Sequence, residues 1–154
     1  MLKINLVCVG KVKEKYFAEG IAEYVKRLQR FCEFSITEVA EENAKNLDGL
    51  IIAEKEGKSI LPKLRGTVFA LAIEGKKYSS QEFAKEIKKQ ADGGASEITF
   101  VIGGSYGISE EVKKRADKLI SFSDMTFPHT LFRLMFTEQI YRAFCIIGGT
   151  PYHK

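Results

Sequence analysis

Three short runs of apolar and β-branched residues recur along the chain, at residues 4–10, 67–73 and 98–104. Nearly continuous apolar runs of this length are typical of strands that are buried on both faces of a parallel sheet. Residues 33–39 instead alternate apolar and polar positions, which favours an edge or half-exposed strand. A short fifth strand is expected at residues 119–123.

Stretches with a helical spacing of apolar residues separate these strands. In residues 16–31, for example, the side chains that share one face are Ile21, Tyr24, Val25 and Leu28. Further helices are predicted over roughly residues 47–64, 79–91, 109–119 and 128–146.

Two of these helices begin with capping signals. Ser79 and Glu82 have the spacing of a capping box, and Ser109 is followed by Glu110 and Glu111, whose charges favour the helix dipole. The alternation of strands and helices predicts one domain of the α/β class, with a mainly parallel sheet and helices on both faces. In such sheets, ligands bind beyond the carboxyl ends of the strands.

Three loops leave those carboxyl ends, with the sequences "IEGKKYSS", "GGSYGISEE" and "FSDMTFPH". In the second, Gly103, Gly104 and Gly107 allow backbone amides to approach a ligand closely. It is not a dinucleotide fingerprint, because Ser105 stands where the second glycine is needed, and no GK[ST] follows to make a Walker A loop. On these residues alone, a tight strand-to-helix turn without a ligand is an equally good interpretation.

The third loop has a different character. Its Pro128 is placed to open a helix, and its backbone groups are suited to hydrogen-bond a neutral planar ring packed against Met125 and Phe127. The alternative is that these two side chains only fill the core.

The last helix is apolar over most of its circumference. The apolar positions are Leu131, Leu134, Met135, Phe136, Ile140 and Phe144. A helix of this kind is either central to a core or packed against a second subunit, so we predict a homodimer closed by two-fold symmetry.

The same helix and the tail behind it carry unusual polar chemistry. The helix holds His129, Arg133, Tyr141 and the pair Glu138 and Arg142, which are four residues apart. As an isolated pair, Glu138 and Arg142 are most simply a solvent-exposed ion pair. The tail ends in Tyr152, His153 and Lys154, which suit stacking on a base and contact with phosphate, although a frayed terminus is the default expectation.

Composition narrows the class of protein. With 45% hydrophobic and 29% charged residues, the 154-residue chain matches an ordinary globular protein, and its net charge of +4 suits a phosphate-rich partner without requiring one. The first apolar run is too short to span a membrane and has no signal-peptide pattern, so a cytoplasmic protein is expected. Its three cysteines are far apart and show no CxxC, which favours buried thiols over a disulfide framework or metal site.

Four motifs in fixed order, "FVIGGSYG", "MTFPH", "EQIYRAF" and the terminal "YHK", resemble those of the RlmH family, the bacterial 23S ribosomal RNA pseudouridine N3-methyltransferases. The resemblance covers the whole chain. It implies a single SPOUT methyltransferase domain over residues 1–154, with a C-terminal trefoil knot that nothing in the hydrophobic pattern indicates. It also implies a homodimer that uses S-adenosyl-L-methionine and acts on large-subunit ribosomal RNA in the assembled ribosome, without a metal or a membrane.

The resemblance also assigns residues by motif. It implies cofactor binding by Leu71, Gly103, Phe122, Ser123, Asp124, Met125, Thr126 and Phe127. It implies an RNA-binding and catalytic role for the C-terminal motifs, with Arg133, Tyr141, Arg142, Tyr152 and Lys154 on RNA and with His153, His129 and Glu138 as catalytic candidates. The tail is implied to complete a site on the partner subunit. The chain departs from the family pattern at Ala72, where an acidic residue is common, and at Tyr106.

The implied reaction requires the pseudouridine N3 to lose a proton to a nearby acceptor. The acceptors in the motifs are His129, His153, Glu138 and Asp124, and His153 is preferred because histidine titrates near neutral pH. Arg133, Arg142 and Lys154 are expected to contact phosphate. Two alternatives are a non-enzymatic ribosome-binding or assembly module and a nucleotide-binding oxidoreductase built on the glycine loop.

Overall fold

The computed structural model describes residues 1–43 and 48–154. In this part of the chain, five strands form one sheet in the order β2-β1-β4-β3-β5, and every neighbouring pair is parallel. The strands are β1 (Lys3–Val9), β2 (Glu33–Val39), β3 (Thr67–Lys77), β4 (Glu97–Ile102) and β5 (Lys118–Ser121). The predicted parallel sheet is therefore confirmed, and residues 33–39 form an edge strand as their pattern indicated.

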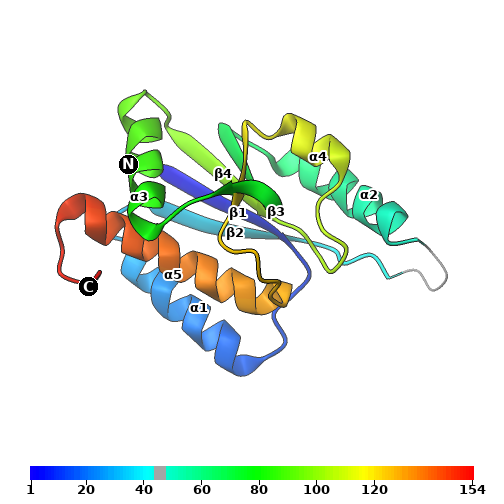
Figure 1. Cartoon of the computed structure of the whole chain (residues 1–154). Helices are drawn as coiled ribbons and strands as arrows, with labels where there is room; N and C mark the ends of the chain where they lie inside the picture. The colour runs from blue at the N-terminus through cyan, green and yellow to red at the C-terminus, as the bar shows by residue number, and fades with distance from the viewer. Residues whose placement is uncertain (44–47) are drawn as a thin grey trace.

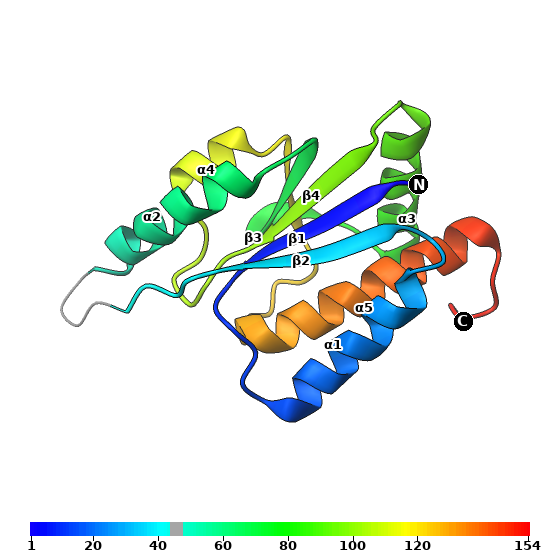
Figure 2. The ribbon, with the colours of Figure 1, turned by 180° about the vertical axis from the view of Figure 1, so that it is seen from behind.

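Helices cover both faces of the sheet (Figure 1). They are α1 (Lys15–Leu28), α2 (Gly49–Ile60), α3 (Ser80–Asp92), α4 (Glu110–Arg115) and α5 (His129–Gly148), with a short 3-10 turn at Leu61–Lys63. Seen from the front and from behind, α1, α3 and α5 lie on one face, and α2 and α4 lie together on the other (Figures 1 and 2). The three-layer α/β class predicted from the sequence is thus the observed one.

The alternation of side chains along β1 divides the core into two clusters. Ile4, Leu6 and Cys8 point toward α1, α3 and α5, where they join Phe100 and Phe136. Residues of the opposite pleat, including Val7 and Val9, belong to a second cluster that contains Val68, Val101 and Val112. A strand that is apolar at every position is needed because both of its faces are buried.

The predicted end of β3 at residue 73 is wrong, since the strand continues to Lys77. Leu71 and Lys76 both pair with Ile120 of β5, so the four residues between them bulge out of the ladder. The insertion shifts the register of β3 against β5, and nothing in the polar sequence "EGKK" indicates that pairing resumes.

The predicted helix over residues 109–119 is also too long, because α4 ends at Arg115. Asp117 ends it by tertiary contact: its carboxylate accepts a hydrogen bond from the Val68 amide at 2.8 Å, and its own amide donates to the Val68 carbonyl at 2.8 Å. Pairing with β3 therefore outweighs the local helical pattern and starts β5.

The caps predicted at Ser79 and Ser109 are both present. The Ser79 side chain accepts from the Glu82 amide while the Glu82 carboxylate accepts from the Ser79 amide, which completes the capping box. The Ser109 hydroxyl accepts from the Val112 amide. Of the helix predicted over 47–64, Leu47 lies outside the described residues, and Asp48 caps the observed start.

Cys8, Cys32 and Cys145 are buried free thiols, as expected. Among the described residues, no helix has the length and apolar character to cross a membrane, and no cluster of three His, Cys, Asp or Glu side chains has metal-binding geometry.

Candidate active site

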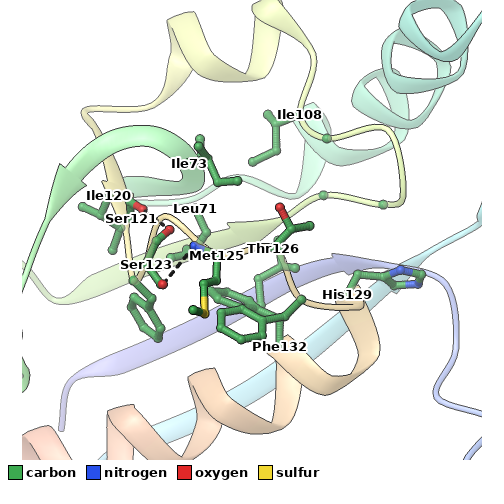
Figure 3. A pocket seen from close by; sticks show the side chains of 17 residues that line it. Leu71, Ile73, Ile108, Ile120, Ser121, Ser123, Met125, Thr126, His129 and Phe132 are labelled. Carbon is green, nitrogen blue, oxygen red and sulfur yellow. Dashed lines mark hydrogen bonds between the residues drawn. The ribbon is translucent and has the colours of Figure 1, made fainter.

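A cavity lies beyond the carboxyl ends of β3, β4 and β5, and it is enclosed by the three loops that leave them (Figure 3). The empty space within it is about 610 Å³, part of which is open to solvent. The bulge of β3, the glycine loop and the segment before α5 each contribute walls. The cavity therefore occupies the position where open parallel sheets bind ligands.

The glycine loop closes tightly on itself. The Gly107 amide donates to the Gly104 carbonyl at 3.0 Å, and Gly107 adopts a left-handed φ of 83°. A Cβ on Gly103 would lie 2.7 Å from the Gly107 carbonyl carbon and oxygen. Only glycine at residue 103 allows this closure, which keeps the backbone close to the cavity.

Hydrogen bonds also fix the segment before α5. The Ser121 hydroxyl donates to the Ser123 carbonyl at 3.0 Å, and the Ser123 hydroxyl accepts from the Met125 amide at 3.0 Å, as the dashed lines in Figure 3 show. Met125 is 73% exposed, so it is not a core side chain. The cavity edge here is a set of ordered backbone groups beside an exposed thioether.

The structure brings together seven of the eight residues expected to bind the cofactor. They line the cavity and are Leu71, Gly103, Phe122, Ser123, Met125, Thr126 and Phe127. Asp124 is not part of the lining, because its carboxylate points outward to Lys77 Nζ at 2.5 Å. Sequence reasoning missed Ile73, Ile108 and Phe132, which also line the cavity and carry no polar signal that would distinguish them from core residues.

The cavity walls suit an uncharged ring system better than a phosphate. Among the described residues that form its lining, there is no lysine, arginine, aspartate or glutamate. Aromatic and aliphatic side chains form most of the surface, and the serine and threonine groups and the loop backbone supply the polar contacts. The glycine loop in this wall lacks the dinucleotide fingerprint, because Ser105 stands where the second glycine is needed, so the oxidoreductase alternative gains no support from the cavity.

His129 is the titratable residue of the lining. It is the first residue of α5, and its ring points away from the other labelled side chains (Figure 3). A Cβ on Gly10 would lie 3.8 Å from His129 Nε2 and 3.5 Å from the Glu41 carboxylate. His129 therefore stands at the rim, near the ends of β1 and β2.

The C-terminal tail folds back onto α5 and α3 of its own chain. Arg142 NH1 lies 3.0 Å from His153 Nδ1, and Gln81 Nε2 lies 2.9 Å from His153 Nε2. Because a guanidinium can only donate, His153 Nδ1 must accept in this arrangement. In the neutral ring the proton is then on Nε2, and the Gln81 amide must turn its oxygen toward it.

Glu138 is the centre of this network. Its Oε1 accepts from Arg142 NH2 at 2.6 Å, from Arg142 Nε at 3.0 Å and from the Tyr152 hydroxyl at 3.0 Å. The hydrogen bond that Arg142 donates to Glu138 raises the pKa of Arg142 above its usual value. Burial raises the pKa of Tyr152, and its hydrogen bonds to Tyr24 and Glu138 act in the same direction, so the phenol stays neutral.

The pair Glu138 and Arg142 thus forms as the spacing predicted, but it is half-buried and shared with the tail. Sequence reasoning missed two partners: Tyr24, whose hydroxyl lies 3.2 Å from that of Tyr152, and Gln81. Both come from distant parts of the chain, and neither has a local pattern that indicates the contact. Tyr141 is buried against Tyr152, with ring centroids 4.8 Å apart, and Lys154 is exposed.

The tail and the cavity are separate in one chain. His129 at the cavity and Arg142 beside His153 are both on α5, and the rise of 1.5 Å per residue puts them about 20 Å apart. In Figure 1 the segment that precedes α5 lies at one end of this helix, and the tail lies beyond the other end. Within a single chain, His153 does not reach a methyl group held in the cavity.

The expected phosphate contact of Arg133 conflicts with its position. Its side chain is buried, with NH1 at 2.5 Å from Glu38 Oε2 and NH2 donating to the carbonyls of Val9 and Gly10 at 3.2 and 3.0 Å. Arg133 therefore ties α5 to the carboxyl ends of β1 and β2. A guanidinium engaged in this way has no free surface for RNA.

Comparison with known proteins gives the class first. The family model described as "Predicted SPOUT methyltransferase" matches residues 2–153, and the chain belongs to this class. Two solved structures share the fold. A protein from Neisseria gonorrhoeae assigned to the methylase family matches with a TM-score of 0.53 and 13% identity, covering 91% of this chain and 81% of that one. A protein from Legionella pneumophila, assigned as a methyltransferase and solved with bound SAM, matches with a TM-score of 0.51 and 14% identity, covering 92% of this chain and 66% of that one.

Curated relatives give the family. Proteins named Ribosomal RNA large subunit methyltransferase H are 57% identical in Levilactobacillus brevis, 56% in Limosilactobacillus reuteri and 53% in Streptococcus thermophilus. Each alignment covers 99% of this chain and 100% of the relative. The chain belongs to the RlmH family, and the resemblance seen in its four motifs is confirmed.

Proposed function

We propose that this protein is a ribosomal RNA methyltransferase that takes its methyl group from S-adenosyl-L-methionine and acts on the large subunit. The observation that carries the proposal is the cavity at the carboxyl ends of β3, β4 and β5, in a chain that aligns along its whole length with Ribosomal RNA large subunit methyltransferase H. A non-enzymatic assembly module has no need of such a cavity. Family membership also leads us to expect the knotted C-terminal threading and action in the cytoplasm.

The residues of the cavity fit S-adenosyl-L-methionine. The cofactor has no phosphate, and the lining offers no cation for one; apolar walls beside the backbone of Gly103 and the 122–127 segment suit an adenine ring. When bound, the cofactor supplies a methyl group on a positively charged sulfur. The chain's own task is to hold that group in line with the nucleophile and to exclude water, which is mainly proximity and orientation.

The finer part of the proposal is that N3 of a pseudouridine is the nucleophile. N3 must lose a proton, and His153 is the residue that we assign to accept it. In its present position Nδ1 accepts from Arg142 and Nε2 carries the proton, so the ring must release the Arg142 contact before Nδ1 can act as a base. Arg142 and Lys154 remain the proposed phosphate contacts, whereas the position of Arg133 removes it from that role.

A homodimer resolves the separation between cavity and tail. In a two-fold pair, the tail of one chain can lie beside the cavity of the other, which a single chain cannot achieve over about 20 Å. A candidate surface exists: a groove between α1, α3 and α5, lined by Tyr24, Tyr78, Phe83, Leu134 and Met135 among others. We propose that two copies pair through this groove.

The test is methyl transfer from labelled S-adenosyl-L-methionine to intact ribosomes that lack the modification. Free ribosomal RNA and ribosomes with uridine at the target position serve as matched substrates. The proposal expects label only on the pseudouridine-containing ribosomes. Tight ribosome binding without label would instead support the assembly module.

A further inference from the structure

Glu56 of α2 is a buried acid with no role so far. Its side chain is 2% exposed, and α2 lies on the face of the sheet opposite α5. Isolated carboxylates are costly to bury, and an apolar residue of the same size would serve packing alone better. The position of Glu56 therefore needs an explanation beyond filling the core.

The carboxyl group has one partner on one oxygen. Glu56 Oε2 accepts from the Glu42 amide at 3.1 Å, in the segment that follows β2. Within the described part of the chain, Oε1 is buried and accepts no hydrogen bond. Burial raises the pKa of Glu56, the Glu42 amide opposes this, and the charges of Glu41 and Glu42 add to it.

The other side of the carboxyl group meets the glycine loop. A Cβ built on Gly104 would lie 2.9 Å from Glu56 Oε1 and 3.2 Å from Oε2, with Val9 Cγ1 also at 3.2 Å. Gly104 lines the cavity, yet this Cβ position faces Glu56. The carboxyl group thus supports the loop from the side away from the cavity.

Two further close approaches hold α2 against the same loop. A Cβ on Gly57 would lie 2.3 Å from Ser109 Oγ, and a Cβ on Gly49 would lie 2.3 Å from Tyr106 Cδ1. Helix α2 therefore contacts the 103–109 segment at three points. These are Gly104, which Glu56 approaches, and the side chains of Tyr106 and Ser109. This leaves the loop little freedom to move away from the sheet.

We propose that Glu56 is a positioning residue of the donor site: its carboxyl group, held by the Glu42 amide, sets the position of Gly104 and so of the Gly103 backbone at the cavity wall. The inference rests on the proposed function, because it assigns the cavity to the methyl donor. Glu56 touches neither donor nor RNA, and it acts only through the loop.

A double-mutant cycle on donor affinity tests the coupling. The dissociation constant of S-adenosyl-L-methionine is measured by calorimetry for wild type, Glu56→Ala, Gly104→Ala and the double variant. Gly104 does not have a left-handed φ, so alanine there meets Glu56 and Val9 without backbone strain. We expect each single variant to weaken binding about tenfold and the double variant to be no weaker than either, because the added methyl group enters the space that the carboxyl group leaves.

Two controls separate positioning from general stability. Glu56→Gln keeps the size and an oxygen for the Glu42 amide, so it should bind the donor within about threefold of wild type and stay as sensitive to Gly104→Ala. Ile87→Ala removes a buried side chain of α3 on the opposite face and should lower stability with donor affinity unchanged. The donor affinity of Ile87→Ala also shows how much a loss of stability alone changes donor binding.

Additive effects in the cycle, or an affinity of Glu56→Ala equal to that of Ile87→Ala, overturn the inference while leaving the donor site in place. Wild-type protein that binds no donor overturns the proposed function itself, and the inference with it. If Glu56→Ala does not fold, Glu56→Gln and Gly104→Ala decide: the inference fails if Gly104→Ala leaves donor affinity unchanged.

Discussion

Two arginines on α5 show that position, and not residue type, decides what a charged side chain does. Arg133 and Arg142 are both part of the C-terminal motifs, and both look equally suited to phosphate from the sequence. In the structure Arg133 is 2% exposed and joins α5 to the sheet, whereas Arg142 is half-buried beside the tail. The first is a structural tie, and the second belongs to the proposed RNA-facing network.

Arg133→Ala should therefore lower the free energy of unfolding more than it weakens RNA binding. Removing one partner of a buried ion pair costs about 3 to 5 kcal/mol, and we expect about 2 to 3 kcal/mol because Glu38 remains partly hydrated. Urea unfolding measures this loss. Lys154→Ala is the matched variant, since it should leave stability unchanged and reduce the salt dependence of ribosome binding. The opposite pattern would restore Arg133 to the RNA surface.

The buried thiols give a prediction on pH. Burial raises the pKa of Cys8 and of Cys32 to about 12, so both remain protonated in the native protein at pH 8. Unfolded thiols ionise near 8.5, so stability should fall as pH rises from there toward 12. We expect no reaction of Cys8 or Cys32 with a thiol reagent at pH 8 without denaturant, and full reaction in guanidinium. Rapid native labelling of Cys8 would show that β1 opens.

At the scale of elements, the sequence predicted what depends on local pattern. The buried strands, the caps at Ser79 and Ser109 and the order of helices follow from periodicity and capping chemistry, and all are present. The continuation of β3 and the early end of α4 depend on pairing with distant residues, such as Val68 with Asp117. Local propensity carries no information about such contacts.

The residues of the candidate site also fall into those that local sequence indicates and those that only the folded chain brings together. Glycines and the segment before α5 can be placed at the cavity because loops at the carboxyl ends of parallel strands converge. Ile73 and Ile108 at the cavity, and Glu56 behind the glycine loop, could not be assigned to the site from the sequence. Each looks like a core or surface residue until the loops are folded. The tail network was equally hidden, because Tyr24 and Gln81 approach it only through the packing of α1 and α3 on α5.

The docking of the tail on α5 is open to a single-atom test. Tyr152→Phe removes the hydroxyl that bonds Glu138 and Tyr24, at a cost of about 1 kcal/mol. We expect about a fivefold loss of methyl transfer at saturating donor, with donor affinity unchanged, because no tail residue lines the cavity. Tyr16→Phe, an exposed change elsewhere, is the control. Weaker donor binding in Tyr152→Phe would mean that the tail also helps to hold the donor, which the account does not expect.

For the whole molecule, the central claim is that a complete site needs two chains. One chain holds the cavity and, about 20 Å away along α5, the tail with His153. The half-buried apolar side chains Leu134 and Met135 line the groove through which we propose that the copies pair. A two-fold arrangement gives two identical sites, each with a cavity from one copy and a tail from the other.

The most direct measurement is methyl transfer by mixed dimers of two inactive variants. Thr126→Trp fills the cavity from an exposed position, and His153→Ala removes the tail histidine. After co-refolding in equal amounts, half of the dimers carry one copy of each, and one of their two sites has both an intact cavity and an intact tail. We predict about a quarter of wild-type activity from the mixture and almost none from either variant alone. A mixture as inactive as its components, with dimers formed, would show that His153 and the cavity act within one chain and would contradict the account.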